Sequence, residues 1–225
     1  MEVGYIFLRQ MSSRSLRQKG KDQTMSDTYN SYNMFPLTVQ VEDCSGSREE
    51  DIRTYHLSKG RLFMSGPIDQ QMAMDFASAM LVLAEEQRDV TIIINSPGGE
   101  VSAGLLIYDT INSYKYNITM YCTGLAASMA AIILAGGQKG RRFILPHSKV
   151  MIHEPLISGG LGGSASSIEK TAHNILETKA VLNRILSKHT GKSIREINKA
   201  TLNDCFMTPE EAIDFGICDS IKSIF

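Results

Sequence analysis

The sequence predicts an α/β protein, because short apolar runs alternate with longer segments whose apolar residues recur at helical spacing. Val90–Ile94 is a β-branched run that is too short for a helix. Asp69–Gln87, which precedes it, and Ala103–Ser113, which follows it, both show the helical spacing. Repeated alternation of this kind is typical of a sheet covered by helices.

The remaining elements are expected from the same patterns and from turn and cap residues. Short strands are expected at Arg61–Met64, Ile118–Tyr121, Phe143–Leu145 and Val150–His153, and helices over Ser128–Leu134 and, after a glycine-rich break at 159–163, over about Ser166–Lys188. Gly191 is expected to end that long helix. Two capping boxes, Ser193 with Glu196 and Thr208 with Glu211, predict two further helix starts.

The chain is expected to form one domain over residues 34–225. Its 225 residues, 43% of them apolar, suffice for one good-sized core. Residues 1–33 are polar and show neither the helical nor the strand period, which predicts a disordered leader or a removable propeptide. Met25 is an alternative start, and an organelle transit peptide is another reading of this segment. The polar stretch Glu42–Asp51 is expected to be a mobile loop.

Composition and charge exclude several classes of protein. With 23 basic and 24 acidic residues spread along the chain, no basic stripe suggests nucleic acid. The four cysteines lie far apart without a C-x-x-C pair, which favours reduced thiols in the cytoplasm. The apolar stretch Ala126–Ala135 falls short of the roughly 20 residues of a membrane helix. Tyr5–Leu8 is too short for the core of a signal peptide.

A glycine pair follows the apolar strand in the segment Asn95–Gly99. Such a pair lets the backbone approach a ligand closely and point amide groups at it, although an ordinary tight turn has the same sequence. Gly99 and Gly104 match the glycines of a phosphate loop, but Leu105 and Leu106 stand where Lys and Ser or Thr are required. The chain is therefore not expected to bind ATP in that way.

Three further residues complete the set of groups that acyl transfer requires. Ser128 lies where a strand gives way to a helix with very small side chains, His153 closes an apolar strand before a proline, and Asp204 precedes a capped helix. Taken singly, they are a helix cap, a structural histidine and a solvated loop acid. Together with a glycine amide they supply a nucleophile, a base, a carboxylate and an oxyanion donor. Their order along the chain matches none of the chymotrypsin, subtilisin or α/β-hydrolase orders.

At these places the sequence resembles the proteolytic subunit of the Clp ATP-dependent protease. The shared phrases are INSPGGEVSAG, GLAASMAA, KGRRFILPHSKVMIHEPL and MTPEEAIDFGICDSI, within a match from about Phe35 to the C-terminus. The resemblance implies that Ser128 is the nucleophile, His153 the base and Asp204 the third member. It also implies that the amides of Gly99 and Met129 form the oxyanion hole.

The same resemblance implies a fold, an assembly and partners. The fold would be crotonase-like, built from repeated β–β–α units, with a protruding strand–helix handle that interleaves two heptameric rings into a tetradecamer. A hexameric Clp unfoldase ATPase would feed unfolded polypeptide into the chamber. This chain would need no cofactor, because the partner uses the ATP. A bacterial-type cytoplasm is the expected location, and an organelle matrix is the alternative.

Some residues depart from the family pattern. Leu202 and Asn203 stand where many members carry an acid–arginine pair that ties the two rings together. Thr91 and Ile93 stand where aromatic residues often line the ATPase docking cleft. These departures suggest a divergent subunit that works with a second Clp-type subunit in a mixed complex. A non-catalytic subunit of a mixed ring and a crotonase-type acyl-CoA enzyme are the other readings.

Overall fold

The computed structural model describes residues 6–7, 37–43, 46–157 and 162–224 of the chain. The chain divides into two compact units, residues 1–59 and residues 60–225. The expected leader over residues 1–33 lies outside the described residues except for Ile6–Phe7, as do residues 158–161 of the glycine-rich break. In the part of the chain that the structure describes, no helix is long and apolar enough to cross a membrane.

The first unit is a small antiparallel sheet followed by a short helix. Its elements are β1 (Ile6–Phe7), β2 (Thr38–Asp43), β3 (Gly46–Asp51) and α1 (Ile52–Ser58), and the strand order in the sheet is β1-β2-β3. β3 pairs antiparallel with β2, so the expectation of a mobile loop over Glu42–Asp51 was wrong. The side chains of β3 are polar and almost all exposed, so this part of the sequence shows no apolar alternation. The strand forms because its pairing uses backbone groups, which every residue has.

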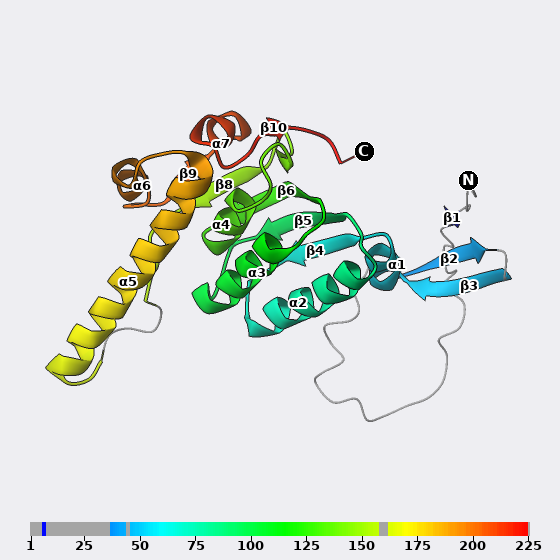
Figure 1. The fold of residues 1–225 in the computed structure, drawn as a ribbon. Coiled ribbons are helices and arrows are strands. Elements are labelled where there is room, and N and C mark those ends of the chain that lie inside the picture. The colour runs from blue at the N-terminus through cyan, green and yellow to red at the C-terminus, as the bar shows by residue number, and fades with distance from the viewer. Residues whose placement is uncertain (1–5, 8–36, 44–45, 158–161, 225) are drawn as a thin grey trace, which may run out of the picture. The chain divides into compact units, whose positions relative to one another are not determined.

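The second unit is built on a largely parallel sheet (Figure 1). The strands of its main path, in the order β10-β7-β6-β5-β4, are Ser220–Ile221, Arg142–Ile144, Ile118–Ala127, Val90–Ser96 and Arg61–Ser65, and all neighbours are parallel. β8 (Lys149–Ile152) pairs parallel with β6, and β9 (Cys205–Met207) pairs antiparallel with β8. The expected α/β class is confirmed, and the structure adds that the sheet is largely parallel.

Strand β6 carries two different neighbours along one edge. β7 pairs with Met120–Cys122, and β8 pairs with Leu125–Ala127 further along. Since β5 pairs with β6 beside both stretches, β7 and β8 occupy the opposite edge one after the other. The last residues of β6 therefore have β8 and then β9 beside them, and this corner of the sheet holds the site described below.

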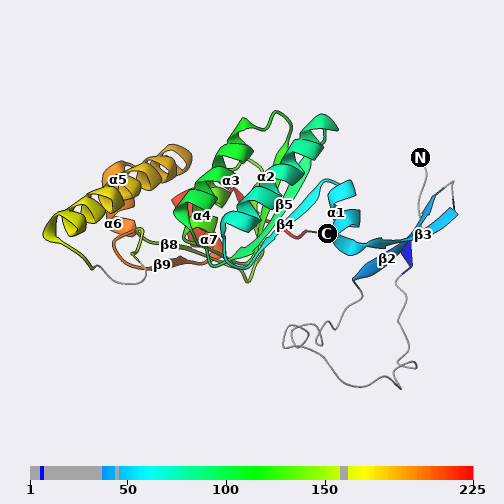
Figure 2. The same cartoon turned by 90° about the horizontal axis from the view of Figure 1, so that it is seen from below.

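Three helices cover one face of the sheet, as Figures 1 and 2 show: α2 (Gln70–Glu85), α3 (Val101–Ser113) and α4 (Met129–Ala135). The core between them and the sheet is apolar, and every residue of α4 is buried. In β5, Val90, Ile92 and Ile94 are buried in alternation with less buried residues. This period of two places one row of side chains under the helices.

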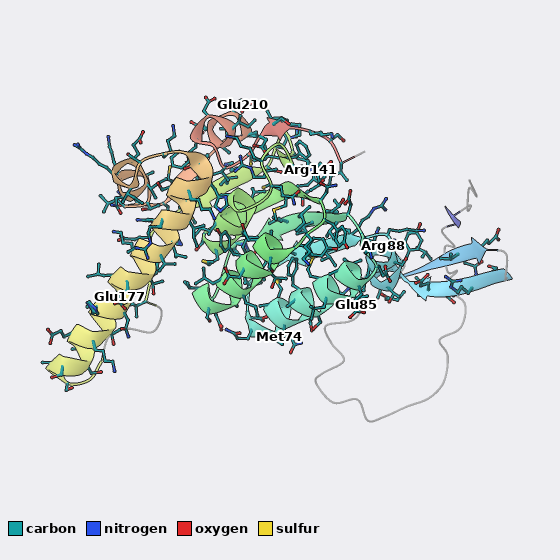
Figure 3. The ribbon with its side chains drawn as sticks, in the orientation of Figure 1. Met74, Glu85, Arg88, Arg141, Glu177 and Glu210 are labelled. Atoms are coloured by element: carbon teal, nitrogen blue, oxygen red, sulfur yellow. The ribbon has the colours of Figure 1, made fainter. Side chains whose placement is uncertain are left out.

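Helix α5 (Ala165–Thr190) extends away from the sheet, followed by α6 (Ile194–Ala200) and α7 (Pro209–Phe215) (Figure 1). Only its C-terminal part is buried, at Leu182, Asn183 and Leu186. Leu176 is 61% exposed. Figure 3 labels the next residue in the chain, Glu177, on this helix. Part of the apolar pattern of this helix therefore does not belong to the core.

The caps that the sequence predicted are present. Gly191 has a left-handed backbone, with φ of 78°, at the end of α5. Both capping boxes, that of Ser193 and that of Thr208, form at the starts of α6 and α7. These three predictions are confirmed, because each rests on chemistry within one turn of the chain.

A buried arginine ties the C-terminal segments to the sheet. Arg142, in β7, is only 3% exposed, and its guanidinium donates to both carboxylate oxygens of Asp219, at 2.6 and 3.0 Å. It also donates to the carbonyl oxygens of Ala135 and Gly216, each at 3.0 Å. Burial raises the pKa of the Asp219 carboxyl, but the hydrogen bonds and charge of Arg142 outweigh burial and hold that pKa below its usual value.

Candidate active site

Ser128 lies at the junction between β6 and α4 in a strained backbone conformation. Its φ of 54° and ψ of −122° are rare for a residue with a side chain. Its amide donates to the carbonyl oxygen of Met151 in β8, at 2.8 Å, which fixes the junction to the neighbouring strand. The hydroxyl makes no capping hydrogen bond to α4. The simple reading of Ser128 as a helix cap therefore does not account for its side chain.

The hydroxyl of Ser128 is bonded instead to His153. The distance from His153 Nε2 to Ser128 Oγ is 2.9 Å, and His153 Nδ1 lies 3.1 Å from Asp204 Oδ1. The imidazole is 18% exposed and the Asp204 side chain 60%. The structure thus brings the three predicted side chains into one hydrogen-bonded chain.

Strand register explains why these three residues meet. In the antiparallel ladder of β8 and β9, Val150 pairs with Met207 and Ile152 with Cys205. The next position in this register puts His153 opposite Asp204. β8 runs parallel to β6, so the two strands end at the same edge of the sheet. His153 follows the last residue of β8 there, and Ser128 follows the last residue of β6. The exposed Asp204 is thus positioned by the ladder rather than by burial.

The glycine turn after β5 lies against Ser128. A Cβ added to Gly98 would come within 2.7 Å of Ser128 Cβ and of the carbonyl oxygen of Ala127. Gly98 also has a φ of +89°, so two independent constraints require glycine here. Its amide donates to the hydroxyl of Ser96, which is 1% exposed, at 3.1 Å. A hydrogen bond within the turn, from Gly98 to Ser96, therefore helps to fix the turn close to Ser128.

The amides of Gly99 and Met129 are the two expected oxyanion donors. The backbone amide of Ile68 donates to the carbonyl oxygen of Gly98, and its carbonyl oxygen accepts from the amide of Glu100. Gly98 and Glu100 are the two neighbours of Gly99. In such a parallel bridge the amide of the central residue points away from the partner strand. Met129 is the first residue of α4, where backbone amides lack partners within the helix. Its buried side chain packs on Gly104 of α3.

The arrangement at this corner is one that can activate a hydroxyl. An imidazole within hydrogen-bond distance of a serine can take its proton, and a carboxylate at the second ring nitrogen fixes the tautomer. In the described part of the chain, no three His, Cys, Asp or Glu side chains gather as a metal ion would require. Cys122, Cys205 and Cys218 are free thiols, and burial raises the pKa of Cys122 and Cys218 to about 12.

Two contacts near the site were not predicted from the sequence. One is the bond from the Gly98 amide to Ser96, for which the phrase Asn-Ser-Pro-Gly-Gly gave a usable signal, since serine before a turn often bonds to the backbone two residues on. The other is an ion pair between Glu154, which follows His153, and Lys179 in α5. No local pattern indicates a pair that is 25 residues apart in the chain.

The fold and the site together define a class, that of α/β proteins with a hydrogen-bonded serine, histidine and aspartate at a corner of the sheet. Residues 44–224 match the family model described as Clp protease. The match covers most of the chain, so this protein belongs to the Clp protease family, as the resemblance of the sequence predicted. It is a peptidase by family.

Proposed function

We propose that this chain is a serine endopeptidase with Ser128 as nucleophile, His153 as general base and Asp204 as the carboxylate that orients the base. The observation that carries the proposal is the continuous hydrogen-bonded chain from Ser128 Oγ through the imidazole to Asp204. The packing of the fold does not require these two hydrogen bonds, because the serine does not cap its helix and the aspartate is largely exposed.

The proposed reaction proceeds in two halves. His153 Nε2 accepts the proton of the Ser128 hydroxyl while Oγ attacks the scissile carbonyl carbon. The resulting oxyanion accepts hydrogen bonds from the amides of Gly99 and Met129, and loss of one such donor typically costs on the order of 10²–10³ in rate. His153 then gives its proton to the leaving amine. Water, deprotonated by the same imidazole, hydrolyses the acyl-enzyme and regenerates the serine.

The proposed assembly follows from family membership. Two heptameric rings would interleave through a strand–helix handle that includes α5, in the crotonase-like arrangement of this family. The exposed apolar residues of the outer part of α5, Ile168 and Leu176, support a contact with another subunit there. A hexameric Clp ATPase would deliver unfolded polypeptide, and a second Clp-type subunit could share the rings. The proposed setting is a bacterial-type cytoplasm.

The test is to treat the purified full-length protein with a fluorophosphonate probe and locate the adduct by mass spectrometry. We expect one label, on Ser128, and hydrolysis of a fluorogenic peptide. Ser128→Ala should lose both while sedimenting as the same oligomer. A folded, oligomeric parent that takes up no label would refute the proposal and favour a non-catalytic subunit.

A crotonase-type acyl-CoA enzyme is the alternative from the same fold. Such chemistry holds a thioester enolate with paired backbone amides and needs no serine nucleophile. The observed bonding of Ser128 to His153 therefore favours the peptidase. Saturable binding of a CoA thioester by a protein that the probe does not label would reverse this preference.

A further inference from the structure

Glu154 and Lys179 form an ion pair immediately beside the proposed base. Glu154 directly follows His153, and its carboxylate Oε2 accepts a hydrogen bond from Lys179 Nζ of α5. Both side chains are partly buried, at 34% and 25% exposure. The pair lies outside the proposed serine–histidine–aspartate set, and it links the residue after the base to a helix that mostly extends away from the sheet (Figure 1).

The backbone of Glu154 makes a second connection. Its amide donates to the carbonyl oxygen of Thr201, at 2.8 Å. Thr201 is fully buried at the end of α6 and lies three residues before Asp204. Residue 154 thus contacts α5 through its side chain and, through its main chain, the segment that leads to the proposed carboxylate.

These two contacts of Glu154 lie just beyond the end of strand β8, where no ladder hydrogen bonds fix the backbone. The ladder of β8 and β9 ends at the pair of Ile152 and Cys205, so His153 follows the last ladder residue. Pro155 has no amide hydrogen and cannot continue the ladder. The fixed points on either side of the imidazole are therefore Ile152 in the strand and Glu154 with its two bonds.

We infer that Lys179 is a positioning residue, which holds the backbone of His153 and Glu154 so that the imidazole stays within reach of Ser128 and Asp204. The inference rests on the proposed function. It makes the body of α5 part of the catalytic support, because the Lys179 side chain can bind Glu154 only while this turn of α5 lies against the end of β8.

The fold does not depend on this ion pair. α5 has other anchors close by, namely the buried Leu182 and Leu186 and a hydrogen bond from Asn183 Nδ2 to Asn198 Oδ1 of α6, at 2.7 Å. Loss of Lys179 should therefore leave α5 packed in its place, while Glu154 loses the ion pair and keeps only its backbone hydrogen bond to Thr201. A small displacement of a catalytic group is expensive, at about 100-fold in rate for roughly 1 Å.

The experiment compares full-length variants by peptide hydrolysis, by the rate of fluorophosphonate labelling at Ser128, by melting temperature and by sedimentation. For Lys179→Met we expect kcat and the labelling rate to fall by about 10- to 100-fold with KM within about twofold. Lys179→Arg should restore most of the rate. The exchanged pair, Lys179→Glu with Glu154→Lys, should recover more than either single change. Lys188→Met, at an exposed lysine of the same helix that lies outside its outer part, is the matched control and should behave as the parent.

Several outcomes would overturn the inference. One is a Lys179→Met protein with the kcat of the parent, and another is a loss that Lys188→Met shares. A loss that follows a lower melting temperature or a smaller oligomer, without recovery in Lys179→Arg, would show a structural role only. If Lys179→Met does not fold, Glu154→Gln removes the charge with little change of shape and carries the same expectation. A parent that is not labelled at Ser128 refutes the proposed function itself, whereas a labelled parent with unaffected variants refutes only the role of Lys179.

Discussion

Substituting alanine for Gly98 tests how closely the glycine turn lies against the proposed nucleophile. The new Cβ would lie 2.7 Å from Ser128 Cβ and from the carbonyl oxygen of Ala127, and 3.0 Å from the amide nitrogen of Met129. Carbon atoms in contact prefer at least about 3.5 Å, so the turn and the serine must separate by about 0.8 Å. A shift of this size at a reacting group costs about 100-fold in rate.

The backbone of Gly98 adds a second cost, which a control can separate. A left-handed residue with a side chain costs about 1–2 kcal/mol. Gly140 has nearly the same φ, +82° against +89°, but a Cβ there would meet no atom within 4 Å. Gly140→Ala should therefore lower the melting temperature by about 2–8 °C, the range for a protein of this size, and keep full activity.

The assay is peptide hydrolysis and the labelling rate of Ser128, both measured below the melting temperatures of the two variants. We expect Gly98→Ala to lose about 100-fold or more in kcat/KM, and Gly140→Ala to stay within about twofold of the parent. Activity of Gly98→Ala within threefold of the parent would contradict the close approach of the turn. An equal loss in Gly140→Ala would show that general backbone strain, and not the contact with Ser128, is responsible.

The structure makes three further predictions. Arg142→Met should destabilise the protein by about 3–5 kcal/mol, because it leaves the Asp219 carboxylate, which is only 14% exposed, without its guanidinium partner, and Arg141→Met should cost much less; equal urea midpoints for the two variants would contradict this. Because the folded pKa of Asp219 is lowered, its stabilising contribution should be present above about pH 4 and be lost as the pH falls through the folded pKa. The urea midpoints of the parent and of Asp219→Asn, compared between pH 3 and pH 6, should therefore converge at the acid end, and a constant difference would count against the lowered pKa. With pKa values of about 12, Cys122 and Cys218 should be about 10⁻⁴ thiolate at pH 8 and resist iodoacetamide until the protein unfolds, so rapid alkylation of the native protein would show that they are not buried.

The sequence predicted the elements whose signals lie within a few residues. The β-branched run of β5 and the helical spacing of α2 and α3 gave the α/β class, because burial against a single sheet imposes period two on strands and period 3.6 on helices. Gly191 and the two capping boxes were equally predictable, since a cap is a contact within one turn. The hairpin of β2 and β3 was missed. β2 offers only the two alternating valines Val39 and Val41, and the polar side chains of β3 show no apolar alternation, although its backbone pairs with β2.

The residues of the candidate site could be chosen from the sequence, but their proximity in space could not be predicted from it. Ser128 and His153 stand at recognisable strand ends, whereas Asp204 is one of many exposed acids, 51 residues from the histidine. The family resemblance singled it out, and the register of β8 against β9 places it opposite His153.

The same distinction between sequence and tertiary structure applies to the residues that surround the site. The sequence by itself determined the alternating strands and helices and the strand ends at which the reactive side chains stand. Only the tertiary structure decided that Asp204 faces His153, that Gly98 lies against Ser128 and that Lys179 holds Glu154. The physical reason is that local periodicity and capping are properties of one segment, whereas register and contact arise between segments that packing brings together and that leave no pattern in either one.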